Sequence, residues 1–140
     1  MDNQTIESLI ETAMQARKMA YVPYSNFAVG AALLDGEGNT HAGCNIENAA
    51  FTPGICAERT AVSVAVSKGV RNFTAIAVVG GAANNQPADD CFPCGVCRQV
   101  LMEFCPPNFQ IIIAQSPQNY RIFTLSELLP HGFGPDNLSN

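Results

Sequence analysis

Positive charge is scarce in this 140-residue sequence, which has seven Lys and Arg residues against twelve Asp and Glu and a formal net charge of −5. The few basic residues form no cluster. Nucleic acids and anionic membranes are bound mainly by clustered cations that contact phosphate groups. The composition therefore argues against both as partners.

A long hydrophobic run is also absent. No apolar segment approaches the roughly 18 residues that a membrane-spanning helix requires. Residues 1–4, MDNQ, do not start the basic and then apolar pattern of a signal peptide. We therefore expect a cytoplasmic protein, and the length suits a single domain, residues 1–140, with one well-filled core.

Cysteine, by contrast, is frequent, with six residues in the chain. In a secreted protein an even number of cysteines would indicate disulfides, but nothing in this sequence indicates export. In a cytoplasmic chain with closely spaced cysteines, metal binding or catalysis is the more common explanation.

Hydrophobic periodicity predicts an α/β fold in the order helix, hairpin, helix, strand, helix, hairpin, helix. This order fits a mixed five-stranded sheet between two helical layers. In the third helix the apolar stripe consists of Val96, Val100, Leu101 and Phe104. The expected elements are helices over 3–20, 56–69, 94–105 and 124–130, hairpins over 27–44 and 109–123, and a strand over 73–79.

The segment 54–69, GICAERTAVSVAVSKG, has alternating valines like a strand, but its polar residues fall on one face of a helix. The ending Lys68-Gly69 is typical of a helix C-terminus. Helix is therefore the better interpretation, with its start at about Cys56. Glu58 then lies in the first turn of an apolar helix, where a buried carboxylate without a partner would be costly.

Two predicted helices thus begin with cysteine: Cys56 opens the first, and Cys94 and Cys97 open the other in the spacing Pro-Cys-x-x-Cys. The free N–H groups and the positive dipole end of a helix N-terminus favour thiolate, which is the metal-binding form. Three thiolates suit a tetrahedral zinc ion with one open position, the pattern of catalytic rather than structural zinc.

The spacing alone leaves alternatives open. Cys-x-x-Cys also occurs in thioredoxin-like redox sites, although the βαβ context of those sites is not obvious here. A closed structural zinc site would need a fourth ligand. It would also leave Glu58 without a purpose. The candidates for a fourth ligand are Cys44, Cys105, His41 and, three residues before the motif, Cys91.

Two blocks, NIENAAFTPGICAERTA and PCGVCRQV, together resemble the cytidine deaminases, specifically the small homotetrameric type that acts on free nucleosides. The blocks YVPYSNFAVGAAL and LLPHGFGP extend this resemblance over nearly the whole chain. It implies a three-layer α/β/α sandwich and a cytoplasmic hydrolase of pyrimidine salvage. The implied reaction is zinc-dependent deamination of cytidine and deoxycytidine to uridine and deoxyuridine plus ammonia.

The resemblance also implies roles for residues at the site. Cys56, Cys94 and Cys97 would hold one zinc ion per chain, and a zinc-bound water would attack the amino-bearing ring carbon. Glu58 would be the proton shuttle. Arg59 would donate a hydrogen bond to a ligand sulfur and offset the thiolate charge; its alternative is a solvated helix surface.

Substrate contacts follow from the same resemblance. Phe27 would pack near the base, Asn45 and Glu47 would bind the ribose 3′-hydroxyl, and the backbone N–H of Ala57 would contact the base. Phe133 would reach the site of a neighbouring subunit. Phe27 could instead be a core residue, and Phe133 an anchor for the tail.

The sequence departs from the family pattern at three positions. Phe51 stands where tyrosine is frequent, so the role of Phe51 is open, and Phe92 stands where serine is common. Cys91 is not part of the pattern. None of the three is a predicted zinc ligand. The complete NIEN segment favours ordinary nucleosides over a modified one such as blasticidin S.

Overall fold

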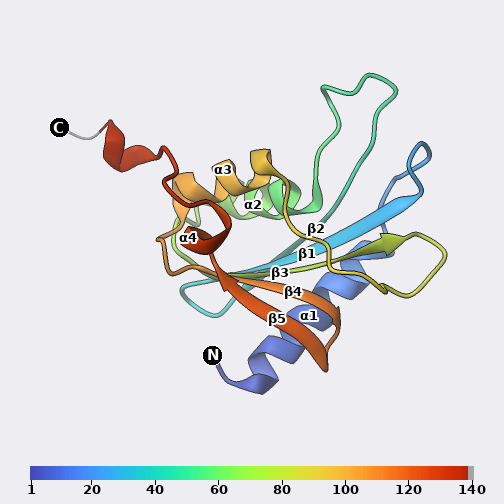
Figure 1. The fold of residues 1–140 in the computed structure, drawn as a ribbon, viewed down its shortest axis with the longest axis horizontal. Coiled ribbons are helices and arrows are strands. Elements are labelled where there is room, and N and C mark those ends of the chain that lie inside the picture. Colours follow the sequence, from blue (N-terminus) through green and yellow to red (C-terminus); the bar gives the residue numbers. More distant parts are fainter. Residues whose placement is uncertain (139–140) are drawn as a thin grey trace.

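A five-stranded sheet forms the centre of the computed structural model, which describes residues 1–138 (Figure 1). The last two residues of the predicted 1–140 domain lie outside the described part. The strands lie in the order β2-β1-β3-β4-β5. In chain order the elements are α1 (Asn3–Arg17), β1 (Phe27–Asp35), β2 (Thr40–Cys44), α2 (Ala57–Ser67), β3 (Phe73–Ala82), α3 (Gly95–Phe104), β4 (Gln110–Ser116), β5 (Asn119–Thr124), α4 (Leu125–Leu128) and a 3-10 turn (Pro135–Asn137).

Strand pairing makes the sheet mixed, as the sequence predicts. β1 is antiparallel to both β2 and β3, β4 is antiparallel to β5, and β3 and β4 are parallel. Parallel neighbours require a crossover connection, which α3 supplies between β3 and β4. Both predicted hairpins, β1–β2 and β4–β5, are confirmed.

Helices cover both faces of the sheet (Figure 1). On one face α1 packs its buried residues Ile6, Leu9 and Ile10 against β1, β3 and β4. On the other face α2, α3 and α4 bury a second cluster that includes Ala61 and Leu101. The predicted α/β/α sandwich is therefore confirmed. Within residues 1–138, no helix has the length and apolar character needed to cross a membrane.

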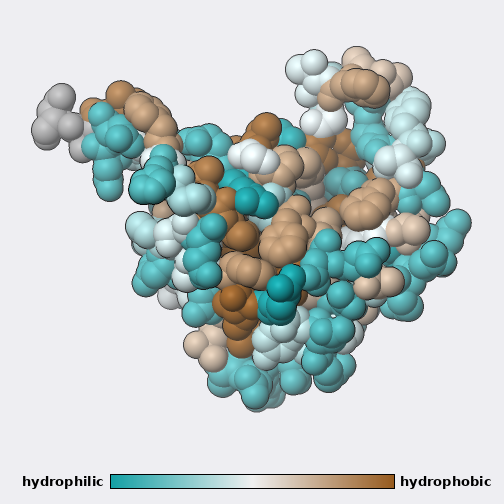
Figure 2. Space-filling view, viewed as in Figure 1, coloured by the Kyte–Doolittle hydropathy of each residue, from teal (hydrophilic) through white to brown (hydrophobic). Residues whose placement is uncertain are grey.

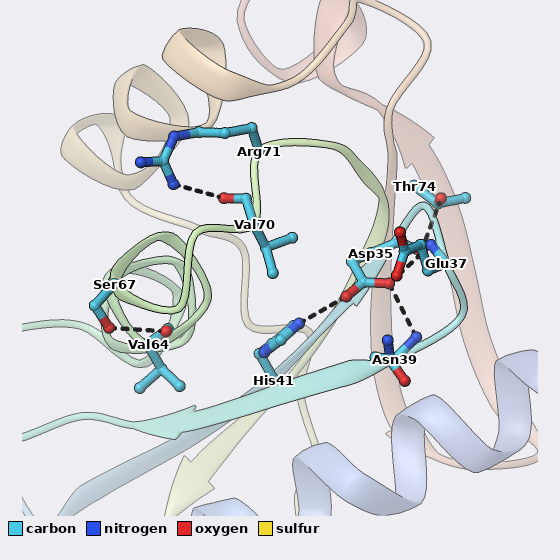
Figure 3. A network of polar contacts seen from close by, with 9 residues as sticks. All are labelled: Asp35, Glu37, Asn39, His41, Val64, Ser67, Val70, Arg71 and Thr74. Atoms are coloured by element: carbon cyan, nitrogen blue, oxygen red, sulfur yellow. Dashed lines mark hydrogen bonds and ion pairs between the residues drawn. The ribbon is translucent and has the colours of Figure 1, made fainter.

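The turn of the first hairpin is closed by Asp35 at the end of β1 (Figure 3). Its carboxylate accepts hydrogen bonds from Nε2 of His41 (2.9 Å) and from the backbone N–H groups of Glu37 (2.9 Å) and Asn39 (3.0 Å). Asp35 and His41 are both buried. The hydrogen bond from His41, followed by those from the backbone, lowers the pKa of Asp35.

Three details differ from the sequence predictions. α1 ends at Arg17 rather than at residue 20, because the next three N–H groups bond to carbonyls three residues back, which makes tight turns. β3 continues to Ala82, since Gly80 and Gly81 remain paired with β1. Val96 is 57% exposed, because the buried face of α3 is centred on Cys97 and Leu101 and leaves Val96 at its edge.

Candidate active site

Three cysteine sulfurs converge where α2 and α3 begin. Cys56 is the N-cap of α2, Cys94 is the N-cap of α3, and Cys97 lies in the first turn of α3. The Sγ atoms of Cys56 and Cys94 are 3.8 Å apart, and those of Cys94 and Cys97 are 3.6 Å apart. All three sulfurs lie within 4.8 Å of one another. Zn–S bonds of about 2.3 Å at tetrahedral angles place two sulfurs about 3.8 Å apart, so this cluster fits zinc.

Small residues allow α2 to approach the sheet closely enough to bring Cys56 to this point. Ala57, Ala61 and Ala65 are fully buried on the face of α2 that meets the sheet. Opposite them, Gly43 of β2 has no room for a side chain, since a Cβ there would lie 2.6 Å from the backbone nitrogen of Ala61. The close packing holds the start of α2 firmly, which is what a ligand of fixed geometry requires.

Within the described part of the chain, the sulfur cluster has no fourth protein ligand. Among residues 1–138, no other His, Cys, Asp or Glu joins it. His41 is bonded to Asp35 in the hairpin turn. Cys91 packs against Gly80 of β3, and burial raises the pKa of its thiol to about 12. The arrangement therefore matches the open site of a catalytic zinc better than a closed structural site.

The cysteines are all reduced. Each of the six is free in the structure, and the spacing of more than 3 Å between neighbouring sulfurs in the cluster is far from the roughly 2 Å of a disulfide.

Glu58 lies two residues after Cys56 and is only 4% exposed. Burial, and to a smaller extent the charge of Cys56, raise the pKa of Glu58 to about 7, although its own backbone N–H acts in the opposite direction. A carboxyl group that titrates close to neutral pH can both accept and give a proton. Its place beside a possible metal site makes it a candidate general acid and base.

Arg59 follows directly and turns its guanidinium toward the cluster. Its Nη2 donates a hydrogen bond to Sγ of Cys56 at 3.6 Å. Hydrogen bonds from Cys97 and then from Arg59 lower the pKa of Cys56 to about 5, which favours the thiolate over the thiol. Zinc with three thiolates carries a net charge of −1, which the guanidinium partly offsets.

A cavity of about 330 Å³ adjoins Cys56 and Arg59. The loop between β2 and α2, which projects from the fold in Figure 1, supplies much of its wall. Phe51 on this loop is 92% exposed. The lining residues are Tyr24, Asn45, Ile46, Glu47, Asn48, Phe51, Gly54, Ile55, Cys56 and Arg59.

Two predicted substrate contacts, Asn45 and Glu47, line this cavity and also hold its wall together. The side chain of Asn45 accepts from the backbone N–H of Val29 and donates to the carbonyl of Phe27, both at 2.9 Å. Oε1 of Glu47 accepts from the backbone N–H groups of residues 24 and 25, at 2.9 and 3.2 Å. These hydrogen bonds lower the pKa of Glu47, and one from the Ser25 side chain has the largest effect. Glu47 is therefore ionised at neutral pH.

The remaining predicted contacts lie outside the cavity wall. Phe27 begins β1 and is exposed, and Ala57 is the first residue of α2, where N–H groups lack helical partners. Phe133 follows α4 and is 59% exposed. It lines no part of this cavity.

Five of the cavity residues have no role that the sequence predicts: Tyr24, Ile46, Asn48, Gly54 and Ile55. Isolated bridges pair Ile46 with Tyr21 and with Ile55, and the backbone N–H of Tyr24 bonds to Glu47. Such single bridges join loops and leave no periodic pattern in the sequence. Only their positions in two blocks, YVPYSNFAVGAAL for Tyr24 and NIENAAFTPGICAERTA for the other four, could have drawn attention to them.

Comparison with known proteins agrees with this geometry. Residues 3–113 match the family described as "Cytidine and deoxycytidylate deaminase zinc-binding region". A cytidine deaminase of Sporosarcina psychrophila is 46% identical over 134 residues, covering 96% of this chain and 95% of its own. One from Halalkalibacterium halodurans is 44% identical over 140 residues, covering all of both chains. The crystal structure of the Burkholderia pseudomallei cytidine deaminase superposes with a TM-score of 0.81 at 43% identity, covering 90% of this chain and 97% of the other.

Proposed function

This chain belongs to the family of cytidine and deoxycytidylate deaminases, and we propose that it converts cytidine and deoxycytidine to uridine and deoxyuridine by hydrolysis. The reaction consumes one water and releases one ammonia. The observation that carries the proposal is the cluster of three sulfurs at zinc spacing with the buried Glu58 beside it.

Cys56, Cys94 and Cys97 would hold the zinc ion. When bound there, zinc supplies a Lewis acid that makes a water molecule nucleophilic near neutral pH. Arg59 and the N-termini of α2 and α3 draw negative charge away from the thiolates. This withdrawal matters because the negative charge of three thiolates would otherwise make zinc a weak Lewis acid.

Glu58 would carry the protons of the reaction. It takes a proton from the attacking water and gives one to the ring nitrogen beside the amino-bearing carbon. Glu58 then takes a second proton, from the hydroxyl that the water has left on this carbon, and gives it to the amine, which departs as ammonia and leaves the uracil carbonyl. The burial of Glu58 supports this role, because a carboxyl group shielded from water exchanges its proton with the substrate and not with solvent.

The nucleoside would bind at the start of α2, with its ribose in the cavity beside Cys56 and its base just outside the cavity wall. We assign Phe27 and the backbone N–H of Ala57 to the base and Asn45 and Glu47 to the ribose. The Asn45 amide group has two N–H donors, and only one is needed for the carbonyl of Phe27, so the other can reach a hydroxyl. Glu47 brings negative charge, and among residues 1–138 Arg59 is the one cationic residue in the wall, which suits a neutral nucleoside better than a phosphorylated one.

Each chain would contribute one domain, residues 1–140, to a cytoplasmic homotetramer. Apolar side chains gather on the surface and on the projecting loop and tail (Figure 2). Phe51 and Phe133 are among the exposed ones. Phe133 lines no part of the cavity of its own chain, and on the family resemblance we assign it to the site of a neighbouring subunit.

The direct test is turnover by the purified protein. Zinc content would be measured while cytidine, deoxycytidine and cytidine monophosphate are followed by loss of cytosine absorbance and by ammonia release. We expect turnover of both nucleosides and little of the monophosphate. Absence of nucleoside turnover by zinc-replete protein would refute the proposed function, and size-exclusion chromatography with light scattering would test the tetramer.

A further inference from the structure

The segment that follows α4 is held against α3 by a specific hydrogen bond. Nε2 of Gln99 donates to the backbone carbonyl of Phe133 at 2.7 Å. Gln99 belongs to the PCGVCRQV block but is exposed and is no part of the sulfur cluster. The function proposed above gives it no role.

Close packing supports this hydrogen bond on both sides of Phe133. A Cβ on Gly132 would lie 3.0 Å from the side chain of Leu129 and 3.3 Å from Sδ of Met102. A Cβ on Gly134 would lie 2.9 Å from Cε of Met102. The backbone of the segment therefore lies flush on the Met102 side chain of α3. A side chain at either flanking glycine would collide with Met102 or Leu129, so the close approach to α3 depends on both glycines.

Residues 134–137 also form a hydrogen-bonded turn of their own. The backbone N–H of Gly134 donates to Oδ1 of Asn137 at 2.8 Å, which closes a turn directly after Phe133. Arg98, next to Gln99, donates to the carbonyls of Pro93 (2.7 Å) and Leu128 (2.6 Å). α3 thus fixes the chain at Leu128, the last residue of α4, and again at Phe133.

The ring of Phe133, in contrast, is 59% exposed although its backbone is fixed. An aromatic side chain held on a rigid backbone loses little conformational entropy when a partner covers it. From these contacts we infer that Gln99 is a positioning residue, which aims Phe133 at the site of the neighbouring subunit. This inference rests on the proposed function, in which Phe133 completes that site.

The substitution Gln99→Met tests it, because Met keeps the length of the side chain and removes the donor. An aromatic contact made equally in ground and transition states affects KM and not kcat. We expect KM for cytidine to rise about five-fold, the effect of one ordinary hydrogen bond, with kcat and zinc content unchanged. Gln99→Lys keeps a donor for the carbonyl of Phe133 and should largely restore KM. Gln118→Met, in the exposed β4–β5 turn, is the matched control.

A double-mutant cycle with Phe133→Ala separates the positioning role of Gln99 from the role of Phe133 in the shared site. If Gln99 acts through Phe133, the double variant has the same KM as Phe133→Ala alone. A further rise in the double variant, or loss of zinc in Gln99→Met, would overturn the positioning role. If Phe133→Ala raises KM and Gln99→Met does not, the inference fails and the shared site stands. If Phe133→Ala leaves KM unchanged, the shared site itself is refuted and the inference with it.

Discussion

Replacing Glu58 with Gln removes the proposed proton carrier while the sulfur cluster stays intact. Gln has the same shape as Glu and fits the same space, which matters for a side chain that is only 4% exposed. Positioned acid–base catalysis contributes about 100- to 10,000-fold to a proton transfer, and Glu58 is assigned to several transfers. We therefore expect kcat to fall by at least about 10,000-fold, equivalent to about 5.5 kcal/mol of activation free energy.

The metal readout separates lost chemistry from lost structure. Glu58 lies outside the group of residues that fits zinc, so the variant should still bind about one zinc ion per chain, measured by atomic absorption. Its melting temperature should stay equal or rise, because burial disfavours the ionised carboxylate that Gln replaces. Glu7→Gln on the exposed side of α1 is the control. A zinc-loaded Glu58→Gln protein with activity within about 100-fold of the parent would refute the assigned role.

Three further outcomes are expected. Cys91→Ser should keep zinc and activity whereas Cys56→Ser should lose both; the reverse result in a chelator-competition assay would replace the ligand set. Gly43→Ala should lower the free energy of unfolding by about 1–3 kcal/mol, because the new Cβ would lie 2.6 Å from a backbone nitrogen of α2. An unchanged denaturation midpoint would contradict this, because it would show that α2 can shift away from the new Cβ without loss of stability. Asp35→Asn should weaken the acid sensitivity of the fold. Hydrogen bonds lower the folded pKa of Asp35, so its stabilisation is present at neutral pH and is lost as the pH falls below about 4. Equal slopes of melting temperature against pH for variant and parent would contradict this.

Elements with a local signal are the ones that the sequence predicts well. The capping box of Thr124 and Glu127 predicts α4, and both of its hydrogen bonds are present. Cysteine at two helix starts predicts where the sulfurs meet, because an N-cap position follows from the helical period. Cys91 illustrates the limit: its spacing makes it a rival ligand, and only its packing against Gly80 removes it from the cluster.

Contacts between distant segments carry no such signal. Asn45 is expected from the family resemblance to bind ribose, yet its amide group also ties the cavity loop to β1 through Val29 and Phe27. That second role depends on the register that brings the end of β2 beside the start of β1. A single sequence does not specify this register residue by residue. The same holds for Gln99, whose bond to Phe133 spans 34 residues.

Phe92 departs from the serine common in cytidine deaminases, and its ring finds a partner on β5. It packs edge-on against Phe123 with ring centroids 5.2 Å apart, and the guanidinium of Arg121 lies 5.9 Å from one ring and 5.2 Å from the other. Arg121 also pairs with Asp90. A cation–π contact at an exposed site contributes only about 0.5–1 kcal/mol. All of these contacts, however, restrain the same short segment, which leads directly to Cys94. The departure therefore adds support to the backbone that positions Cys94, one of the three sulfurs proposed to hold zinc, at a place where the site depends on fixed geometry.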